Sequence, residues 1–445
     1  MIVMKFGGTS LGDAERVSTV CDLVMAEERD PLVVVSGHSK VTDMLIRVAT
    51  EALGGRIEDG LEEVRERHME IIRALGLSDA IIAGNIRTLG ELLRGIFLVK
   101  ELTPRTLDFV MSFGERMSSK VVAAALQARG VDAAAVNSYE LGFITDSEYG
   151  NARPLDEAAD DIQAAYAHYA GKQVVTTGFI GKNKAGEITT IGRSGSDYSA
   201  SFFGGALGAD EIQIWTDVDG VLTADPSIIP QAKPLDRMTF SEASEVAYYG
   251  GEVLHPGTMR PAISRGIPVR VKNTFKPDAP GTLIVPDSDR LADGEVKSIV
   301  YKENVVLVHV ESTRMLLRHG FMAKLFDALG RHGVIVDMIA TSEVSVSMTT
   351  DSMRGVAEAA EELRADADIN SEVRVEENKA VVCVVGKGMR HVVGLAARVF
   401  SAVARSGVNI EMISQGASEI NIAFVVSNAD IEPAVAALHG EFFES

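Results

Sequence analysis

The sequence predicts an α/β protein. Its larger part is a three-layer α/β/α fold around a mostly parallel sheet, and two smaller βαββαβ units follow. Three observations predict this. Short apolar runs alternate with helix-forming stretches, each run ends in a glycine or polar turn, and the last third of the chain contains an internal repeat. Continuous apolar runs are typical of strands that are buried on both faces of a parallel sheet.

Composition narrows the class of protein. The 445 residues suffice for roughly two to four domains, and 46% apolar with 24% charged residues is typical of a soluble globular chain. We find neither a long apolar run nor a basic segment before an apolar one, so we expect no membrane span and no signal peptide. The net charge of −20 argues against nucleic-acid and anionic-membrane partners. Cys21 and Cys383 are expected to be buried thiols in a reducing cytoplasm.

The first ten residues combine a strand with a turn that suits phosphate. The apolar run 1–6 stops at two glycines, and Thr9 or Ser10 can cap the helix expected over 13–28. Glycines let backbone N–H groups approach a phosphate, and the positive end of a helix then faces it. Lys5, at the strand end, is a candidate cation for a transferring group. The turn lacks the Walker A spacing, and plain structure explains it equally well by itself.

Further strands are expected at 31–35, 131–136, 173–179, 211–215 and 267–271, with helical stretches between them. In parallel sheets of this kind, ligands bind outside the carboxyl ends of the strands. The turns at or near these ends carry charged residues, and we expect them to form one site: Lys5, Glu115, Arg193, Asp197, Asp217 and Lys272.

A segment rich in Pro, Asp and Gly, 278–294, reads as a linker. We therefore place a catalytic domain at 1–283 and a linker at 284–296.

The chain after the linker repeats itself. Residues 320–326 resemble 394–400, and 333–339 resemble 407–413 at the same offset. The first copy closes with a strand at 371–375, whereas the second has no residues left for one, and an open sheet edge is unfavourable. We hypothesise that the spare strand 297–302 completes the second copy. The two units would then be interleaved as 303–376, and 297–302 with 377–445.

Six segments, in this order, resemble motifs of the aspartate kinase family: Lys5–Ser10, Ser112–Glu115, Gly192–Asp197, Thr216–Gly220, His255–Pro256 and Val271–Phe275. The two repeats resemble the paired ACT domains of that family, which bind amino acids. The resemblance runs from residue 1 to 445. It is to the monofunctional form, and it implies an amino-acid-kinase fold for the first domain.

The sequence departs from the family pattern at four positions. Lys40 and Ser194 stand where the family usually has glycine. Leu222 and Ser227 stand where it usually has a tyrosine and an arginine near the nucleotide. A ring contact and a phosphate-binding cation are thus missing from their usual places, and Lys272 or Lys276 would have to supply the charge.

The resemblance implies transfer of the ATP γ-phosphoryl group to the β-carboxylate of L-aspartate. The product is 4-phospho-L-aspartate, at the first step of lysine, threonine and methionine biosynthesis. The nucleophile is a carboxylate with a pKa of about 4, so no general base is required. Two anions must meet in line, so catalysis rests on positioning and cations. We expect ATP with Mg²⁺ held mainly by phosphates, and no metal site made by the protein.

The resemblance also assigns roles to four charged residues. Lys5 would contact the transferring phosphoryl oxygens. Asp197 would orient Lys5 or the metal shell, or else cap a helix. Arg193 would hold the substrate α-carboxylate, because a guanidinium fork matches carboxylate geometry. Glu115 would hold the α-ammonium, unless it forms an ion pair with Arg116 or with a neighbouring helix.

The expected contacts form three sets, although the hydroxyl and turn residues among them can also be plain caps or turn formers. The catalytic set is Lys5, Arg193 and Asp197. The substrate set is Ser36, Thr42, Glu115, Arg193, Ser194, Gly195 and Ser196. The nucleotide set is Lys5, Gly7, Gly8, Thr9, Ser10, Thr216, Asp217, Leu222, Lys272 and Lys276.

The ACT resemblance implies feedback by an amino acid, with lysine favoured over threonine. The alternative is a structural sheet edge that binds nothing. The expected effector site consists of Met315, Phe321, Met322, Asp337, Thr341 and Ser342. ACT sheets commonly pair edge to edge, so a homodimer or a higher homo-oligomer is expected.

Two alternatives remain open from the sequence. One is another kinase of the same fold, acting on glutamate, acetylglutamate, carbamate or UMP. The other is an amino-acid sensor with weakened catalysis, which the residues at 222 and 227 keep open.

Overall fold

The computed structural model describes residues 1–251, 256–288, 294–316, 318–366, 369–416 and 420–444. They form two compact units. The first comprises 1–221, 234–240 and the described part of 253–289. The second comprises 222–233 and the described parts of 241–252 and 290–445. Within the described residues, no helix is both long and apolar enough to cross a membrane. His255, from one of the six motifs, lies outside the described residues.

The expected limit of the first domain needs correction. Residues 222–233 and 241–251 belong to the second unit, and a strand at Thr282–Val285 enters the segment expected to be linker. Hydrogen bonds explain the first difference. The Ser298 hydroxyl donates to the Leu222 carbonyl at 2.8 Å, and the Tyr301 hydroxyl donates to Asp225 at 2.9 Å.

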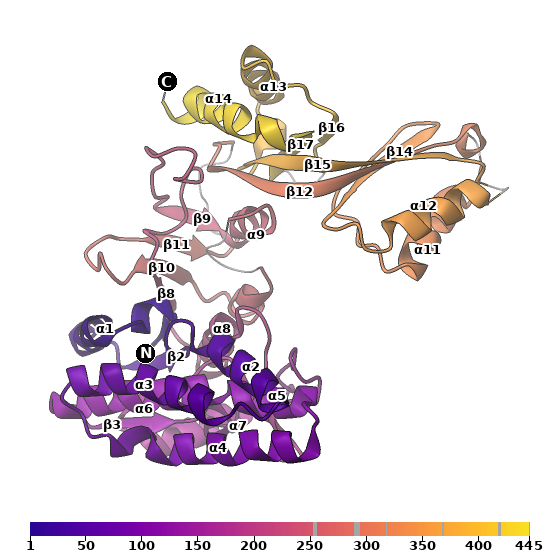
Figure 1. Ribbon diagram of the computed structural model, residues 1–445. Coiled ribbons are helices and arrows are strands. Elements are labelled where there is room, and N and C mark those ends of the chain that lie inside the picture. The colour runs from indigo at the N-terminus through magenta and orange to yellow at the C-terminus, as the bar shows by residue number, and fades with distance from the viewer. Residues whose placement is uncertain (252–255, 289–293, 317, 367–368, 417–419, 445) are drawn as a thin grey trace. The chain divides into compact units, whose positions relative to one another are not determined.

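An eight-stranded sheet, in the order β3-β5-β2-β1-β8-β10-β11-β9, forms the centre of the first unit (Figure 1). Only the β10–β11 pair is antiparallel in this sheet. The strands are β1 Ile2–Phe6, β2 Pro31–Val35, β3 Ala133–Val136, β5 Gln173–Thr177, β8 Glu211–Thr216, β9 Arg237–Thr239, β10 Val269–Asn273 and β11 Thr282–Val285. A small second sheet contains β4 Ile144–Thr145, β6 Ile180–Asn183 and β7 Ile188–Thr190. The predicted α/β class with a mostly parallel sheet is confirmed.

Helices fill most of the chain between the strands of the first unit. They are α1 Ala14–Ala26, α2 Val41–Ala52, α3 Glu58–Ala74, α4 Ala80–Val99, α5 Pro104–Met111, α6 Phe113–Ala128, α7 Ala158–Tyr166, α8 Gly195–Leu207 and α10 Arg260–Ile263. Helices α2 to α6 follow one another between β2 and β3. Helix α9, Phe240–Tyr248, begins in the first unit and continues in the second.

Strand β1 divides its side chains between the two faces of the sheet. Ile2, Met4 and Phe6 enter the large core shared with α1 to α4 and α6. Val3 points the other way and approaches α8 at Gly204. Because side chains alternate along a strand, Lys5 also lies on the α8 face. The alternation of apolar residues thus fixes which helix the one lysine of β1 meets.

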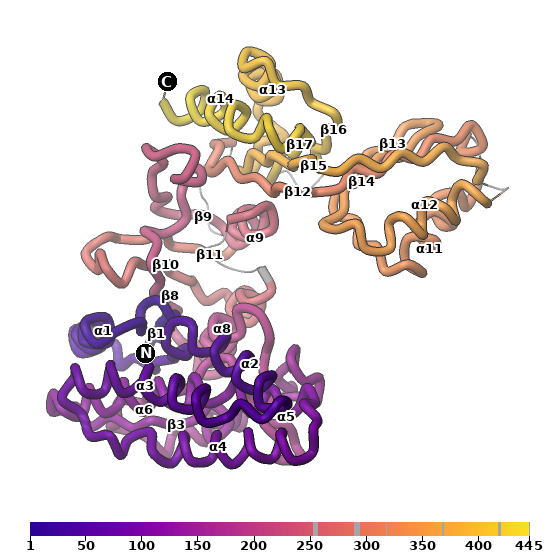
Figure 2. The backbone as a smooth tube through the Cα atoms, in the orientation of Figure 1, coloured from indigo at the N-terminus to yellow at the C-terminus, as the bar shows by residue number. Residues whose placement is uncertain are grey.

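The second unit contains one six-stranded antiparallel sheet, in the order β13-β14-β12-β15-β17-β16. The strands are β12 Ser298–Glu311, β13 Ile339–Thr341, β14 Ser345–Thr350, β15 Glu372–Val385, β16 Met412–Ser414 and β17 Asn421–Ser427. The helices are α11 Phe321–Arg331, α12 Val356–Ala365, α13 Leu395–Arg405 and α14 Ile431–Phe443. Figure 2 shows β14 near α11 and α12, and β17 near α13 and α14.

Strand β12 serves both repeats. Its first part, Ser298–Lys302, pairs with Val381–Val385 of the second repeat, and its later part pairs with β14 of the first. Accordingly Ile299 is buried in the core under α13 and α14, whereas Val308 is buried in the core under α11 and α12. This is the pairing that interleaved repeats require.

Candidate functional site

A hollow of about 690 Å³ opens at the carboxyl ends of β1, β2 and β8. It gathers fourteen of the residues predicted to bind substrate or nucleotide: Lys5, Gly7, Gly8, Thr9, Ser36, Thr42, Glu115, Arg193, Ser194, Gly195, Ser196, Asp197, Thr216 and Asp217. The expectation that ligands bind outside the carboxyl ends of the strands therefore identified most of the lining, although these residues come from distant parts of the sequence.

Lys5 and Asp197 form an ion pair at the base of this hollow. Lys5 Nζ lies 2.6 Å from Asp197 Oδ1, and Lys5 is only 8% exposed. Asp197 is in the first turn of α8, whereas the residue that caps this helix is Ser194. The geometry therefore gives Asp197 the position of a group that orients Lys5, and not that of a helix cap.

A hydrogen bond to β8 holds the glycine turn that follows β1. The Gly7 N–H donates to the Trp215 carbonyl at 3.2 Å. Gly8 passes so close to Gly37 that a Cβ at Gly8 would lie 3.0 Å from the Gly37 carbonyl oxygen. A side chain at Gly8 would therefore force the two turns apart.

The capping prediction for this turn is wrong. Thr9–Leu11 form a short 3₁₀ turn, and Asp13 caps α1 by accepting from the Arg16 N–H at 2.9 Å. Ser10 is fully buried and hydrogen-bonds to the Trp215 carbonyl and to Thr274. Ser10 thus joins two strand ends and does not line the hollow.

Glu115, on α6, is a buried carboxylate that is only half satisfied. It is 3% exposed, and its Oε1 accepts from the Gly37 N–H at 2.9 Å. Its Oε2 is buried and has no hydrogen-bond partner within the described part of the chain. Burial raises the pKa of Glu115 to about 7, although the hydrogen bond from Gly37 opposes the shift.

Glu115 does not form the ion pair with Arg116 that was its alternative role. The Arg116 guanidinium lies instead over the Phe113 ring, with 4.7 Å from its carbon to the ring centroid. The free Oε2 is therefore available to a cation that enters the hollow.

The turn before α8 presents positive groups to the hollow. Arg193 is exposed and makes no ion pair with any described residue. Ser194 has a φ of +56° and Gly192 a φ of +85°, so the chain passes through left-handed backbone before Gly195 begins the helix. Left-handed backbone favours glycine, which explains why a glycine fits the position of Ser194. The N–H groups at the start of α8 are suited to an anion.

The second turn has the same backbone feature. Lys40 has a φ of +66° and precedes α2, whose first turn contains Thr42. Ser36 is anchored by its backbone, since its N–H donates to the Phe6 carbonyl at 3.1 Å and its carbonyl accepts from Ser118 at 2.6 Å. The two positions where the sequence departs from glycine are thus both in the left-handed region.

Thr216 and Asp217 end β8 and line the hollow, and the Thr216 hydroxyl donates to Asp217 at 3.2 Å. Besides Ser10, three predicted nucleotide residues are not in this lining. Lys276 is exposed and pairs with Asp219 at 2.6 Å, and Leu222 belongs to the second unit.

Lys272 is the third of these residues, because strand β10 extends to Asn273 and includes it. Lys272 is paired in register with Trp215, and its ammonium lies 4.7 Å from the Trp215 ring centroid. It lines a different hollow, of about 510 Å³, and the expectation that it joins Lys5 is wrong.

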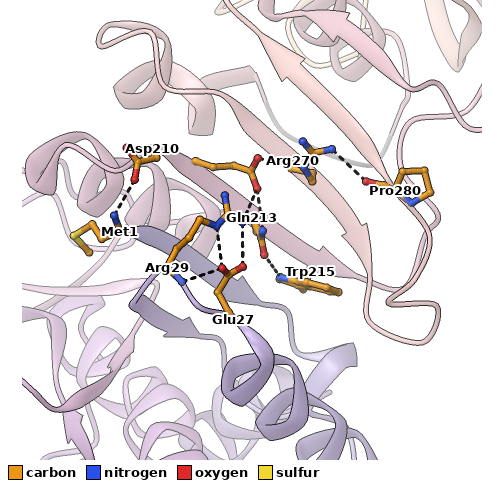
Figure 3. A network of polar contacts seen from close by, with 9 residues as sticks. Met1, Glu27, Arg29, Asp210, Gln213, Trp215, Arg270 and Pro280 are labelled. Atoms are coloured by element: carbon orange, nitrogen blue, oxygen red, sulfur yellow. Dashed lines mark hydrogen bonds and ion pairs between the residues drawn. The ribbon is translucent and has the colours of Figure 1, made fainter.

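A polar network that the sequence did not predict fixes Trp215 (Figure 3). The Trp215 indole N–H donates to Gln213 at 3.0 Å, and the Gln213 amide donates to Glu211 at 2.9 Å. Glu211 also pairs with Arg270 at 3.2 Å and with Arg29 at 3.5 Å. The network holds β8, whose Trp215 carbonyl accepts the N–H of Gly7 in the glycine turn.

The sequence also did not indicate two buried residues that support the hollow, Asp108 and His38. Asp108, 1% exposed, accepts from the N–H groups of Thr190 at 2.8 Å and Gly150 at 3.0 Å, and burial raises its pKa. His38 donates to the Leu11 carbonyl at 2.7 Å, and burial lowers its pKa to about 3. An aspartate inside an apolar helix was the available signal for Asp108.

The predicted effector residues do not form one cluster within the chain. Phe321 is buried in the core of the first repeat, and Met322 packs against the same core. Met315 lies in a short 3₁₀ turn and contacts that core as well. The Phe321 ring is therefore a core residue and not a surface contact.

Asp337 lies apart from Thr341 and Ser342. The Ser342 N–H donates to the Ser345 carbonyl, whereas the Asp337 N–H donates to the Thr349 carbonyl. Ser345 and Thr349 are separated by about 13 Å along β14, at roughly 3.3 Å per residue. The carboxylate of Asp337 instead contacts Lys302 at 3.4 Å and accepts from the Tyr248 hydroxyl.

Comparison with known proteins places this geometry in a family. Residues 1–273 match the amino acid kinase family, and residues 308–370 and 382–442 match an ACT domain. The chain is 40% identical to aspartokinase 1, chloroplastic, of Arabidopsis thaliana, over 100% of the chain and 80% of that protein. It is 33% identical to lysine-sensitive aspartokinase 3 of Escherichia coli, over 100% of the chain and 99% of that protein.

Solved structures of an aspartokinase also resemble this chain. The fold resembles E. coli aspartokinase III in complex with aspartate and ADP (R-state), with a TM-score of 0.82, 32% identity and full coverage of both chains. It also resembles that enzyme in complex with lysine and aspartate (T-state), with a TM-score of 0.80, 32% identity, and coverage of 100% of this chain and 99% of that one.

Proposed function

Because the chain belongs to the aspartokinases of the amino acid kinase family and carries C-terminal ACT domains, we propose the following function. It transfers the γ-phosphoryl group of ATP to the β-carboxylate of L-aspartate, giving 4-phospho-L-aspartate and ADP, under ACT regulation. One observation carries the proposal: the unpaired buried oxygen of Glu115 lies in the same hollow as the Lys5–Asp197 ion pair.

The substrate's two α-groups have complementary partners in this hollow. An α-ammonium would satisfy Glu115 Oε2, which otherwise carries the free-energy cost of a buried unpaired carboxylate oxygen. Arg193, exposed and without a carboxylate partner among the described residues, would hold the α-carboxylate through its planar fork. The β-carboxylate of aspartate would then be left free to face Lys5.

The chemical step needs charge stabilisation and not proton removal. The β-carboxylate is ionised at neutral pH, so in-line attack on the γ-phosphorus is limited by repulsion between two anions. Lys5 would stabilise the transferring phosphoryl oxygens, and Asp197 would hold the Lys5 ammonium in place. The N–H groups of Gly8 and of Ser196, in the first turn of α8, would add donors, whereas the Gly7 N–H already donates to the Trp215 carbonyl.

The nucleotide is proposed to lie toward Thr216 and Asp217 at the end of β8. Mg²⁺ bound to ATP would neutralise phosphate charge. The described residues provide no group of three His, Cys, Asp or Glu side chains that could hold a metal. Phosphate oxygens would supply most of its ligands, because Mg²⁺ is usually bound through substrate phosphates and few carboxylates.

For regulation we propose that the effector is lysine, with threonine as the alternative. E. coli aspartokinase III was solved with lysine and aspartate in a T-state. In this chain Asp337 already pairs with the Lys302 ammonium and sits near Asp351, which contacts the same lysine. A free amino group would replace Lys302 at Asp337.

We also propose an oligomeric state, domain limits and a location for the protein. A homodimer or a higher homo-oligomer would form through β13 and β16, which end the sheet order and carry the partly exposed Ile339 and Ile413. The domain limits would follow the interleaved repeats. A reducing cytoplasm would suit the two buried thiols, Cys21 and Cys383.

The experiment is ADP release from ATP and Mg²⁺ on addition of L-aspartate. D-aspartate, L-glutamate and UMP serve as matched acceptors, and lysine and threonine are added in turn. Release that requires L-aspartate, and that lysine suppresses, is expected. Release with another acceptor would support a different kinase of this fold, and no release from folded protein would support a sensor.

A further inference from the structure

A third hollow in the first unit carries cations that the kinase reaction does not use. It has a volume of about 450 Å³ and lies where α5, α6 and the β6–β7 hairpin meet, and six side chains define it: Arg105, Phe109, Arg116, Tyr139, Lys182 and Glu187. We name it the Arg116 pocket. It shares no lining residue with the hollow that contains Lys5.

Arg116 is incompletely satisfied. Its Nη1 is buried and has no hydrogen-bond partner among the described residues. The guanidinium lies over Phe113 and, at 5.8 Å from the ring centroid, near Phe109. Aromatic faces stabilise the cation but accept no conventional hydrogen bond from a buried N–H, so an acceptor is still missing.

Lys182 is the second cation without a counter-charge. Its ammonium lies 4.6 Å from the Tyr139 ring centroid and makes no ion pair with the described residues. The phenol of Tyr139 is within electrostatic range of Arg116, which acts to lower its pKa against the effect of burial. Tyr139 therefore lies under the influence of both cations.

The one carboxylate of the pocket is already committed. Glu187 pairs with Arg105 at 2.8 Å, accepts from Asn183 at 2.9 Å and also accepts from the Tyr149 hydroxyl. These partners hold its pKa at about 2, so it is ionised but saturated. The pocket therefore contains three cations, Arg105, Arg116 and Lys182, and one carboxylate, so two positive charges are not neutralised within it.

The local charge contrasts with the whole chain. The protein carries a net charge of −20. One turn further along α6, Lys120 adds another cation, whose pKa burial and Arg116 lower, whereas the Glu140 carboxylate acts against this shift. Mutual repulsion between cations is unfavourable unless an anion neutralises it. A volume within the range of small-molecule pockets, lined by aromatic rings and positive charge, suits a flat anionic ligand.

We propose that the Arg116 pocket binds a small phosphate monoester attached to a flat ring. Arg116 and Lys182 bind the phosphate, since a guanidinium fork and an ammonium are the usual partners of that group. Phe109 and Tyr139 contact the ring. The inference stands on this pocket alone and does not depend on the kinase reaction.

The test is titration of the full-length protein with phenyl phosphate, followed by ligand-observed NMR. Inorganic phosphate and benzoate are titrated in parallel. Arg116→Leu and Lys182→Gln each remove one cation, and Lys172→Gln removes a charge from an exposed lysine outside the pocket. We expect phenyl phosphate to bind more tightly than either parallel ligand. Each pocket variant should weaken binding at least about tenfold, with Lys172→Gln unchanged.

Several outcomes would overturn the proposal. One is no binding of phenyl phosphate to the wild type. Another is equal binding of inorganic phosphate, which would indicate an adventitious ion only, or equal binding of benzoate, which would remove the role of phosphate. A third is equal affinity in Lys182→Gln and Lys172→Gln. Lys182 is partly exposed at the pocket wall, so its variant is expected to fold even where Arg116→Leu does not.

Discussion

At the scale of single residues, the site depends on two buried charged groups with different surroundings. Lys5 is paired with Asp197, whereas Glu115 is buried with one oxygen unpaired. The unpaired oxygen of Glu115 is unfavourable by itself and becomes favourable when a substrate brings an ammonium.

The pKa of Glu115 predicts a pH dependence. Burial raises this pKa to about 7, and only the ionised form can hold an ammonium, so acid should weaken aspartate binding. Below about pH 7, kcat/KM for aspartate should fall by about tenfold per pH unit. The α-ammonium and carboxylates of aspartate do not titrate between about pH 5 and 8.

The measurement is kcat/KM against pH at saturating ATP, for the wild type and for Glu115→Gln. The variant should be slow and should lack this acid limb, and its profile corrects for titration of ATP. An identical acid limb in both proteins would remove Glu115 from the account.

Lys5→Met tests the phosphoryl role. Loss of a cation that acts mainly in the transition state should lower kcat by about 100- to 1,000-fold, with little change in the KM for aspartate. Asp197→Asn keeps the side-chain size but removes the partner of Lys5, and should have a smaller effect. A Lys5→Met enzyme that retains kcat within about threefold of wild type would contradict the role.

At the scale of elements, strand ends and helix starts decide where these residues lie. The sequence indicated most of the lining because each apolar strand ends in a polar turn. It did not indicate that β10 continues through Lys272, since a lysine inside a buried strand runs against the pattern. Nor did it indicate Asp108 or the Gln213–Glu211 network, which depend on contacts between distant segments.

The starts of α2 and α8 carry backbone strain. Lys40 and Ser194 have φ values of +66° and +56°, which are unfavourable for residues with a Cβ. Lys40→Gly and Ser194→Gly should each raise the free energy of unfolding by up to about 1 kcal/mol, after the entropy of glycine is subtracted.

Ala83→Gly is the control, because this exposed residue lies within α4 of the same unit, where glycine should cost about 1 kcal/mol. Urea unfolding of the three variants measures the difference. Equal destabilisation by all three would show that the left-handed turns carry no strain.

At the scale of the whole molecule, the two repeats are interleaved, so that one repeat combines segments that are not consecutive in the sequence. The internal repeat and its missing strand were visible in the sequence, and they predicted a partner for 297–302. The inclusion of 222–233 and 241–251 in the second unit was not visible, because these segments follow the pattern of the first domain.

Strand β12 provides a paired test. Ile299→Ala should destabilise the second repeat, and Val308→Ala the first, because each residue is buried in a different core. Cavity formation at Ile299 should cost about 2–5 kcal/mol, with a smaller cost at Val308. Hydrogen exchange should therefore quicken in α13 and α14 for Ile299→Ala, and in α11 and α12 for Val308→Ala. The same helices responding to both variants would contradict interleaving.

The most direct test of the central claim is to trap the product. The full-length protein is incubated with ATP, Mg²⁺, L-aspartate and hydroxylamine, which converts an acyl phosphate to a hydroxamate. The account predicts aspartyl hydroxamate in proportion to ADP released, and its loss in Lys5→Met and Glu115→Gln. ADP release without hydroxamate, or no reaction from correctly folded protein, would contradict phosphoryl transfer to the aspartate carboxylate.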